Sequence, residues 1–379
     1  MQDASPSPNT LHRQTSLSSK NWRLSRRLFL GVTLTGLLAA CGSSPTTTAS
    51  PTTTTTLPPR MLAPTESISP ANAALLQKLG VLKVNMGRVR GVAWSPDSKT
   101  LAIGTEWAVQ LWDVSTGKLQ TTLQGATDQV YQLAWSPDGQ LLATGVSDKT
   151  TRVWDMQSHT LLQTLPGTDS VVFSVAWSPS GDRLAVGNSD GVVQVWERAN
   201  WSKAGSWNDP STPGQFHSGR FHTAAYTVGW SPDGQLLAAT RYDGYLRVWN
   251  ASSGKLLHLL PTSSQPNGLS WSPDGHILAL SSDDGTIQFW DTASYQNTRT
   301  LNAKEQGEWA FAIPWSPDGR LLACSRDGGS MQVWDTQAGK ELQSLSEQTS
   351  SIWTAAWSPD NQRIASGSDD GTVVLWGIH

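Results

Sequence analysis

The sequence is short of cysteine and of long apolar runs. It has two cysteines, Cys41 and Cys324, in 379 residues, and its most apolar stretch, Leu28 to Ala40, covers 13 residues. A membrane-spanning helix needs about 20 apolar residues, so this stretch is too short to be one. Cys324 follows three apolar residues and is expected to be an inert thiol in the protein core.

An excess of basic residues is also missing. The net charge is −3, and five basic residues and one acidic residue lie within the first 40 positions. The remainder therefore holds 22 basic and 29 acidic residues, a net charge of −7. Proteins that bind nucleic acid need a basic surface, so no nucleic-acid partner is expected.

Motifs that carry chemistry are absent too. The sequence has no phosphate-binding glycine loop, no cysteine cluster for zinc and no paired-histidine zinc motif. Gly145 and Ser147 begin a nucleophile-elbow pattern, but Lys149 stands where the second glycine is needed. His217 and His222 lack a clear third ligand and are expected to be surface residues. No catalytic residue, cofactor or metal site is predicted, and the chain is not expected to be an enzyme.

The N-terminal segment, residues 1–40, has the order of features found in export signals. Residues 1–27 are polar and basic, and the apolar stretch that follows is typical of the hydrophobic region of a signal peptide. The stretch Ser25 to Leu30 contains Arg26 and Arg27 and resembles the bacterial twin-arginine export motif. Gly31 departs from this motif, in which lysine is often found at that position. The alternative is a chance pair of arginines before a buried helix.

The residues that follow the apolar stretch point to a lipid anchor. Leu38-Ala39-Ala40-Cys41 resembles the lipobox of bacterial lipoproteins. The resemblance implies cleavage before Cys41 and attachment of a diacylglyceryl group to its sulfur, which leaves no disulfide. The chain is therefore expected to be exported and held on the extracytoplasmic side of a membrane through this lipid alone. Residues 41–70 are rich in Ser, Thr and Pro and are expected to form an extended, disordered tether.

Tryptophan, in contrast, is abundant: there are 20 tryptophans against 6 phenylalanines, which suggests an internal repeat. A Trp-Ser-Pro-Asp-Gly pattern recurs, followed by Leu-Ala, a turn, and Val-x-Val-Trp-Asp, with small variations. The first tryptophans of the units are Trp94, Trp135, Trp177, Trp230, Trp271, Trp315 and Trp357. The second tryptophans are Trp112, Trp154, Trp196, Trp249, Trp290, Trp334 and Trp376.

Each unit alternates apolar and polar residues in four short runs separated by turn residues, which predicts four strands. A sheet of this size has no core of its own and must stack on its neighbours. The pattern resembles the WD-repeat family over residues 76–379. The resemblance implies an all-β fold for residues 71–379: a seven-bladed β-propeller of four-stranded antiparallel blades, expected to be monomeric. The last unit stops after its third strand, so the segment Lys78–Met86 is expected to close the ring as the missing strand.

One family feature is largely missing. WD repeats often carry a histidine before the first strand, where it joins a buried hydrogen-bond network. The corresponding pairs here are Gly125-Ala126, Gly167-Thr168 and Gln348-Thr349, and only His222 is a plausible equivalent. The histidine network is therefore expected to be mostly absent.

Two features indicate a binding face at the first-strand end of the units. An insert, residues 208–221, enlarges the loop before the fourth unit, and long loops are often functional. The residue four positions before each first tryptophan is aromatic in five of seven units. The series is Arg90, Tyr131, Phe173, Tyr226, Asn267, Phe311 and Trp353. The face is completed by Trp107, Trp309, Arg241, Tyr242 and Arg326 from neighbouring positions and by Phe216 and Phe221 from the insert.

Aromatic residues and arginine are enriched at binding hot spots, so these residues predict a scaffold that binds a protein or peptide partner. The alternative is a glycan or small ligand at the aromatic channel mouth, because flat rings stack on sugar faces. A hidden hydrolase site is a third hypothesis. The rings could also serve only to pack the blades together, and the insert could be a tolerated surface loop.

Overall fold

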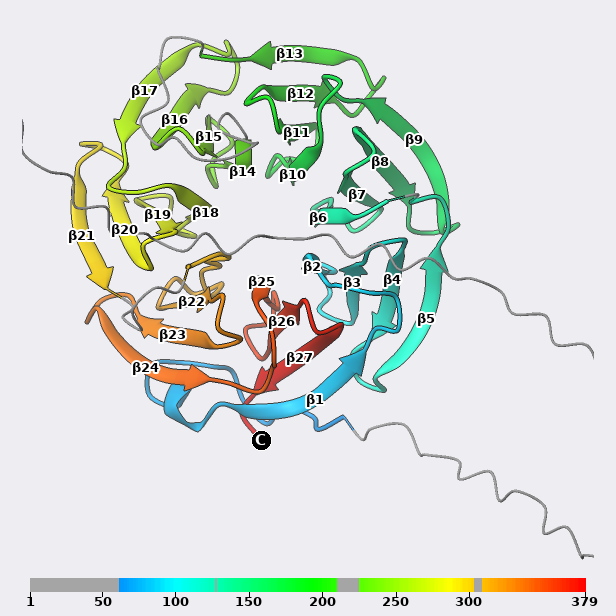
Figure 1. Cartoon of the computed structure of the whole chain (residues 1–379), viewed down its shortest axis with the longest axis vertical. Coiled ribbons are helices and arrows are strands. Elements are labelled where there is room, and N and C mark those ends of the chain that lie inside the picture. The colour runs from blue at the N-terminus through cyan, green and yellow to red at the C-terminus, as the bar shows by residue number, and fades with distance from the viewer. Residues whose placement is uncertain (1–60, 127, 210–224, 303–308) are drawn as a thin grey trace, which may run out of the picture. The chain divides into compact units, whose positions relative to one another are not determined.

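The computed structural model of the chain describes residues 61–126, 128–209, 225–302 and 309–379. These residues form seven antiparallel sheets that radiate from a central axis like the blades of a propeller (Figure 1). The expected seven-bladed architecture is confirmed. Among the described residues there is one helix, the three-residue 3₁₀ turn η1 (Ala73–Leu75), and no helix is long and apolar enough to cross a membrane.

Blades 1 to 4 each contain four strands, numbered from the centre outward. Blade 1 consists of β2 (Gly91–Trp94), β3 (Thr100–Gly104), β4 (Val109–Asp113) and β5 (Lys118–Leu123). Blade 2 consists of β6 (Val130–Trp135), β7 (Leu141–Val146), β8 (Thr150–Asp155) and β9 (Thr160–Pro166). Blade 3 consists of β10 (Val172–Trp177), β11 (Arg183–Asn188), β12 (Val193–Glu197) and β13 (Lys203–Trp207). Blade 4 consists of β14 (Ala225–Trp230), β15 (Leu236–Arg241), β16 (Tyr245–Asn250) and β17 (Leu256–Pro261).

The remaining blades complete the ring. Blade 5 consists of β18 (Pro266–Trp271), β19 (Ile277–Ser282), β20 (Thr286–Asp291) and β21 (Asn297–Asn302). The sheet of blade 6 consists of β22 (Leu321–Ser325), β23 (Met331–Asp335) and β24 (Lys340–Leu345). Blade 7 consists of β25 (Ile352–Trp357), β26 (Ile364–Ser368), β27 (Thr372–Gly377) and the N-terminal β1 (Gln77–Lys83).

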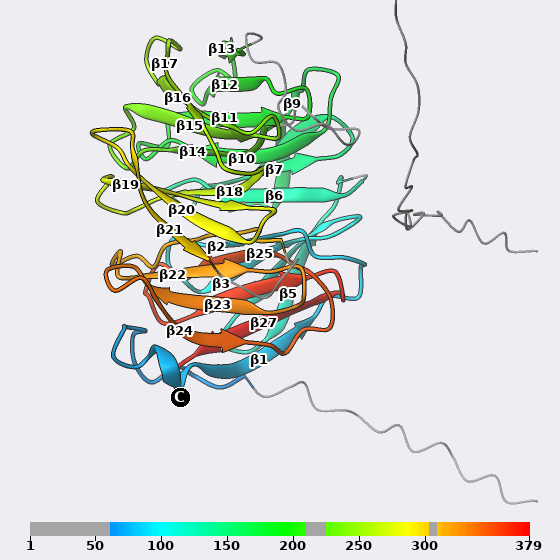
Figure 2. The ribbon, with the colours of Figure 1, turned by 60° about the vertical axis from the view of Figure 1, so that its left-hand side comes forward.

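The hydrophobic core lies between the blades, which stack face to face (Figure 2). Each buried apolar cluster draws its residues from two neighbouring blades. Between blades 1 and 2, for example, Leu111 and Leu123 pack with Val130, Leu142 and Trp154. Because one twisted sheet cannot enclose a core, the apolar faces become buried only when the ring is assembled.

The first tryptophan of every unit links its blade to the preceding one. Its indole Nε1–H donates a hydrogen bond to the backbone carbonyl of the residue just before the first tryptophan of the previous blade, at 3.0–3.1 Å in all seven cases. The bond from Trp94 to the carbonyl of Ala356 joins blade 1 to blade 7. The repeated tryptophan thus combines apolar burial with a satisfied donor, which explains its frequency.

The Ser-Pro-Asp-Gly turns directly follow the first tryptophans, and each turn also lies against the turn of the preceding blade. In blade 2 the Ser136 hydroxyl donates to Asp138, and the backbone amide of Leu141 donates back to that hydroxyl at 2.9 Å. Gly139 has a φ of 70°, and a side chain there would meet Pro96 of the preceding blade at 3.6 Å. Glycine is favoured because it reaches this left-handed conformation without a steric penalty.

The ring closes through the N-terminal strand, as the sequence predicted. β1 pairs antiparallel with β27, with Val81 opposite Val374 and Leu82 opposite Val373. The strand covers Gln77–Lys83, so it begins one residue before the expected segment Lys78–Met86 and ends three residues before its end, and the residues after it turn toward blade 1.

Packing begins before the expected end of the tether at residue 70. Ile68 is fully buried, and its amide donates to the carbonyl of Asn361 in blade 7 at 2.8 Å. Glu66 forms a β-bridge with Ile378, and Ala73 in η1 is also buried. Residues 61–76 therefore form a strap. It crosses blade 7 at the end where the Ser-Pro-Asp turn of that blade lies.

The inner segment of blade 6 departs from the pattern. Ala310 and Trp315 form only isolated bridges, to Arg326 and Leu322, so the sheet has three regular strands. Pro314 lies between them and has no N–H to donate to β22, which interrupts the ladder at that point. The segment still accepts a hydrogen bond from β22, since the amide of Ala323 donates to the Pro314 carbonyl at 3.0 Å.

Two buried polar residues answer questions raised by the sequence. Gln348, one residue before the position aligned with the family histidine, accepts a bond at 2.7 Å from the Ser366 hydroxyl, which itself accepts one at 2.9 Å from Trp376 Nε1. Blade 7 thus keeps a buried network with glutamine in place of histidine. Cys324 is fully buried as expected, and burial raises the pKa of its thiol to about 11.

Candidate binding site at the channel mouth

The residues predicted to form the binding face share one structural position. Tyr131, Phe173, Tyr226, Asn267 and Trp353 each fall at a register shift in the innermost strand of their blade. A β-bulge leaves one residue unpaired and redirects its side chain. Arg90 and Phe311 occupy the equivalent positions of blades 1 and 6, where no full inner strand extends. The repeat thus places one such residue per blade at the same end of the channel.

Six of these seven residues line one cavity of about 400 Å³ in the centre of the ring. They are Arg90, Tyr131, Phe173, Asn267, Phe311 and Trp353. Deeper in the channel the wall is formed by small and apolar residues such as Leu269, Ile313 and Ala355, with polar groups from Gln132 and Thr354. An apolar cavity of this size with a few polar groups has the character of a ligand site.

The aromatic side chains form two separate pairs around the mouth. The rings of Phe311 and Trp353 are stacked, with centroids 4.0 Å apart and an interplanar angle of 26°. The guanidinium of Arg90 lies 3.9 Å from the centroid of the Trp353 ring, a cation–π contact. Tyr131 and Phe173 meet edge to face, with centroids 4.8 Å apart. These contacts hold the rings in fixed orientations before any ligand arrives.

Arg90 is also fixed by an ion pair with Asp369, at 3.1 Å between Arg90 Nε and Asp369 Oδ1. Burial lowers the pKa of Arg90, an effect that Asp369 opposes. Burial likewise raises the pKa of Asp369, and Arg90 opposes that rise. Burial raises the pKa of Tyr131 against the influence of Arg90. The centre of the mouth therefore holds a desolvated but paired charge beside flat rings, and both features suit recognition better than proton transfer.

The other predicted residues fall into two groups. Trp309 is 44% exposed and meets Phe311 edge to face at 6.2 Å, so it extends the aromatic surface outward. Trp107, which is 58% exposed, and Tyr242 lie on rim turns of blades 1 and 4. Arg241 and Arg326, in contrast, are 7% and 1% exposed. These two arginines are buried between blades, and the structure gives them a packing position instead of an accessible one.

Some predicted residues lie outside the part of the chain that the structure describes. They are Arg26, Arg27, Cys41, Phe216, His217, Phe221 and His222. Tyr226 is described only in its backbone, within β14. The described part of the insert is confined to its first residues, where Asp209 is 7% exposed.

A second layer of residues, not predicted from the sequence, lies just below the mouth. Gln132 accepts a bond from the amide of Val175 at 3.0 Å, and Thr354 accepts one from the amide of Val92 at 3.3 Å. Both lie three positions before a first tryptophan, so the same offset that located the ring could have located them. Asp369 was also missed, although it directly precedes the Asp-Gly turn of its unit.

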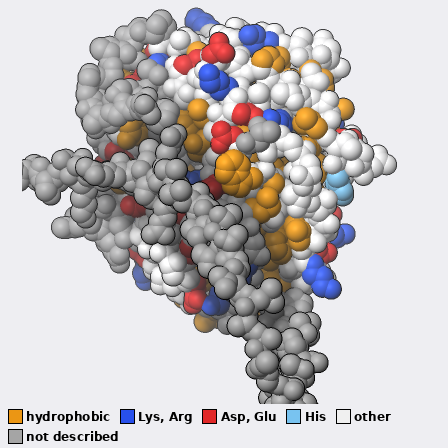
Figure 3. Space-filling model, turned by 45° about the vertical axis from the view of Figure 1, so that its right-hand side comes forward, with side chains coloured by type: hydrophobic (Ala, Val, Ile, Leu, Met, Phe, Trp, Pro, Cys, Tyr) orange, Lys and Arg blue, Asp and Glu red, His pale blue; other side chains and the backbone are white. Residues whose placement is uncertain are grey.

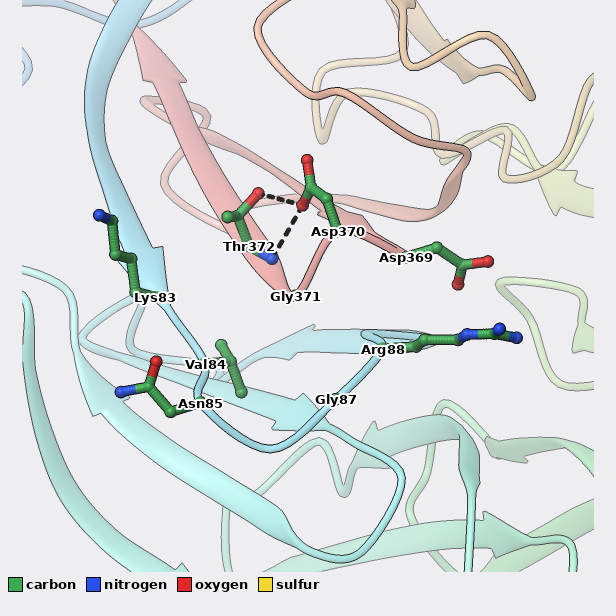
Figure 4. A pocket seen from close by; sticks show the side chains of 9 residues that line it. All are labelled: Lys83, Val84, Asn85, Gly87, Arg88, Asp369, Asp370, Gly371 and Thr372. Carbon is green, nitrogen blue, oxygen red and sulfur yellow. Dashed lines mark hydrogen bonds between the residues drawn. The ribbon is translucent and has the colours of Figure 1, made fainter. Parts of the chain in front are cut away.

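A second cavity, of about 450 Å³, lies at the seam where the ring closes. The turn after β1, including Lys83, Asn85 and Arg88, lines one side, and the turn from Asp369 to Thr372 lines the other (Figure 4). The Asp370 carboxylate accepts bonds from the amide and hydroxyl of Thr372 at 3.0 and 2.6 Å. The Asp370 carboxylate is already used to form the turn. We therefore assign this cavity to the closure of the ring and not to ligand binding. Among the described residues no group of three or more metal-ligating side chains is present.

The fold is a seven-bladed β-propeller, and its repeated tryptophan turns resemble those of WD repeats. The family model for the WD domain, G-beta repeat, matches residues 76–113 and 117–155. The model for the first β-propeller of WDR19 matches residues 226–378, and the model for the WD40 domain of anaphase-promoting complex subunit 4 matches residues 175–272. These matches support a WD-repeat β-propeller family, whose propellers are commonly non-catalytic scaffolds for protein partners. A comparison with curated proteins found no match.

Proposed function

We propose that this chain is a membrane-anchored, extracytoplasmic scaffold that binds a protein or peptide partner at the channel mouth and catalyses no reaction. The observation that carries the proposal is the fixed stack of Arg90, Trp353 and Phe311 over a cavity of about 400 Å³. Tryptophan and arginine held in place before binding lose little conformational freedom on binding, which favours affinity.

The anchor rests on Cys41 and the lipobox-like residues before it. Cys41→Ser removes the sulfur that would carry the lipid, so the variant is expected in the soluble fraction while the native chain stays with the membranes. The measurement is immunoblotting of membrane and soluble fractions after high-salt washing. Identical fractionation of the two proteins contradicts the lipid anchor. That outcome would not bear on the proposed binding site, because Cys41 and the mouth are separate features.

The binding role of the mouth is tested by Trp353→Ala. This change removes one ring of the Phe311 stack and the surface on which Arg90 lies. Truncation of a hot-spot tryptophan weakens binding by about 2 kcal/mol or more, so we expect affinity to fall by at least about tenfold. The measurement is crosslinking on intact cells, followed by purification of the chain and quantification of the proteins that come with it.

The matched control is Leu162→Ala, at a side chain that is 50% exposed on the outer strand β9. It also removes exposed apolar surface, but far from the mouth. Circular dichroism should show that both variants are folded. A partner kept by native protein and Leu162→Ala but lost by Trp353→Ala supports the proposal. A partner that both variants retain equally shows that the mouth is structural.

The dimensions of the mouth favour one alternative, a glycan or small ligand. The cavity has the volume of a small-molecule site, and the partly exposed rings of Tyr131, Phe173 and Trp353 line it and could contact a sugar. A glycan-array signal that disappears in Trp353→Ala, without a protein partner, favours this alternative.

A further inference from the structure

Carboxylates surround the channel mouth. The turns between the second and third strands of blades 5, 6 and 7 carry Asp283, Asp327 and Asp369. Their backbone amides donate to the carbonyls of Gln265, Trp309 and Ser351 at 3.0–3.1 Å. Each of these acceptors lies two residues before a mouth residue. The three aspartates are therefore held beside Asn267, Phe311 and Trp353.

Further acids belong to the same turns. Asp190 in blade 3 and Asp370 in blade 7 are partly exposed, and Asp284 in blade 5 is exposed. Burial, reinforced by the neighbouring charge of Asp284, raises the pKa of Asp283. Figure 3 shows hydrophobic, acidic and basic side chains side by side on one described face. Apolar surface and negative charge thus meet at this end of the ring.

The basic residues that the structure describes at this end are mostly withdrawn from solvent. Arg326 and Arg241 are 1% and 7% exposed, and Arg90 is stacked on Trp353 and paired with Asp369. The exposed cations at this end, among the described residues, are Arg88, which contacts Glu106 at 3.7 Å, Lys83 at the end of β1, and Lys149. The accessible charge of the described residues around the mouth is predominantly negative, and the centre of the mouth combines flat rings with the ion pair of Arg90 and Asp369.

We infer that the partner presents a cationic, extended peptide segment to the mouth, with an apolar or aromatic side chain in the cavity and lysine or arginine side chains on the acidic rim. This inference rests on the proposed function and adds the chemical class of the ligand. The cavity of about 400 Å³ has room for one bulky side chain beside the partly exposed rings of Tyr131, Phe173 and Trp353. The surrounding carboxylates speed the approach of a basic segment and disfavour an acidic one.

The test measures binding of fluorescein-labelled peptides to the full chain by fluorescence anisotropy. The probes are a tryptophan flanked on each side by two lysines, by two serines or by two glutamates, and a five-lysine peptide without tryptophan. At low salt we expect the lysine-flanked peptide to bind at least about tenfold more tightly than the serine-flanked one. The preference should shrink as ionic strength rises, because salt screens exposed charges.

A pair of variants separates rim charge from net charge. The rim variant is Asp284→Asn with Asp327→Asn, and the control is Asp155→Asn with Asp291→Asn, at turns on the opposite end of the ring. Asparagine suits the control turns. In the equivalent turn of blade 4, the side-chain oxygen of Asn250 accepts a hydrogen bond from the backbone amide of Ser253 at 2.9 Å. Both double variants remove two negative charges. The rim variant is expected to lose most of the preference for lysine, and the control to keep it.

The outcomes distinguish this inference from the proposed function. Equal binding of the lysine- and glutamate-flanked peptides, no binding of the lysine-flanked peptide, or equal effects of the two double variants overturns the cationic ligand. A cell-surface partner can still be lost in Trp353→Ala under those results, in which case the scaffold proposal stands alone. Tight binding of five lysines that Trp353→Ala leaves unchanged also overturns the inference, because the cavity then has no part in recognition.

Discussion

A chain that starts at Asn85 is expected to lose the cooperative unfolding transition shown by a chain that starts at Met61. The shorter chain lacks β1, so β27 becomes an exposed edge beside an open gap in the ring. Leu79 and Leu82, 2% and 1% exposed, would no longer fill the space between blades 7 and 1, and Ile68 would leave the end of blade 7. Each buried side chain of this size contributes about 1.5–3 kcal/mol, against roughly 5–15 kcal/mol for a whole domain.

Thermal unfolding followed by tryptophan fluorescence measures this effect, because the first tryptophans lie between the blades. The chain that starts at Met61 is the control, since it removes the N-terminal residues and keeps the strap and β1. A synthetic peptide of residues 61–84, added to the shorter chain, should restore part of the transition by filling the gap. Equal midpoints and equal cooperativity for the two chains would show that β1 is not needed for closure.

The architecture was predictable because its signals are local and repeated. Alternation of apolar residues with period two, and turns with proline and glycine at fixed places, specify each strand and hairpin without reference to distant residues. The missing last strand and the apolar segment before the first unit then predicted the closure. The same logic located the mouth, because a fixed offset from the first tryptophan places a residue at the same depth in every blade.

What the sequence did not reveal depends on contacts between blades. Arg241 is the last residue of the second strand of its unit and Arg326 directly follows that strand in its own unit, which put them at the right end of the ring. Their burial depends on how the neighbouring blade covers them, and a single unit carries no sign of that. The β-bulges that turn Tyr131 and Trp353 toward the channel are likewise absent from the alternation pattern.

The strap shows a different reason for a wrong expectation. Its composition continues that of the Ser/Thr/Pro-rich segment, so composition alone extends the tether to residue 70. Ile68 becomes buried only because blade 7 offers a site where its amide can reach the carbonyl of Asn361. In blade 6, Pro314 was visible in the sequence, and its missing N–H was sufficient reason to expect an interrupted inner strand.

Arg247→Ala is expected to be the most damaging single substitution in the described polar core, at about 3–5 kcal/mol of unfolding free energy. Arg247 is 1% exposed and donates from both terminal nitrogens to Asp243, at 3.0 and 2.6 Å. Its Nε lies 3.6 Å from Asp209, and Arg241 lies 3.4 Å from Asp243. Removing Arg247 leaves two buried carboxylates with one nearby guanidinium, so part of their negative charge loses its partner.

Arg152→Ala is the matched control, because Arg152 forms the same pair with Asp148 four residues earlier in blade 2. The side chain of Asp148 is 19% exposed, compared with 2% for Asp243, so solvent can stabilise its charge after the arginine is removed. Urea unfolding followed by tryptophan fluorescence should therefore show a clearly smaller loss for Arg152→Ala. Equal losses would mean that the burial of the blade 4 cluster does not decide its contribution.

A compensating change tests the mechanism itself. Blade 3 has Asp190 and Gln194 at the positions of Asp243 and Arg247, which shows that glutamine fits this place in a blade. Arg247→Gln alone should still be destabilised, because Asp243 keeps its charge. Addition of Asp243→Asn removes that charge and should recover much of the loss, since neutral partners avoid the cost of a buried unpaired ion. If the second change instead adds to the loss, the arginine acts through packing and not through charge.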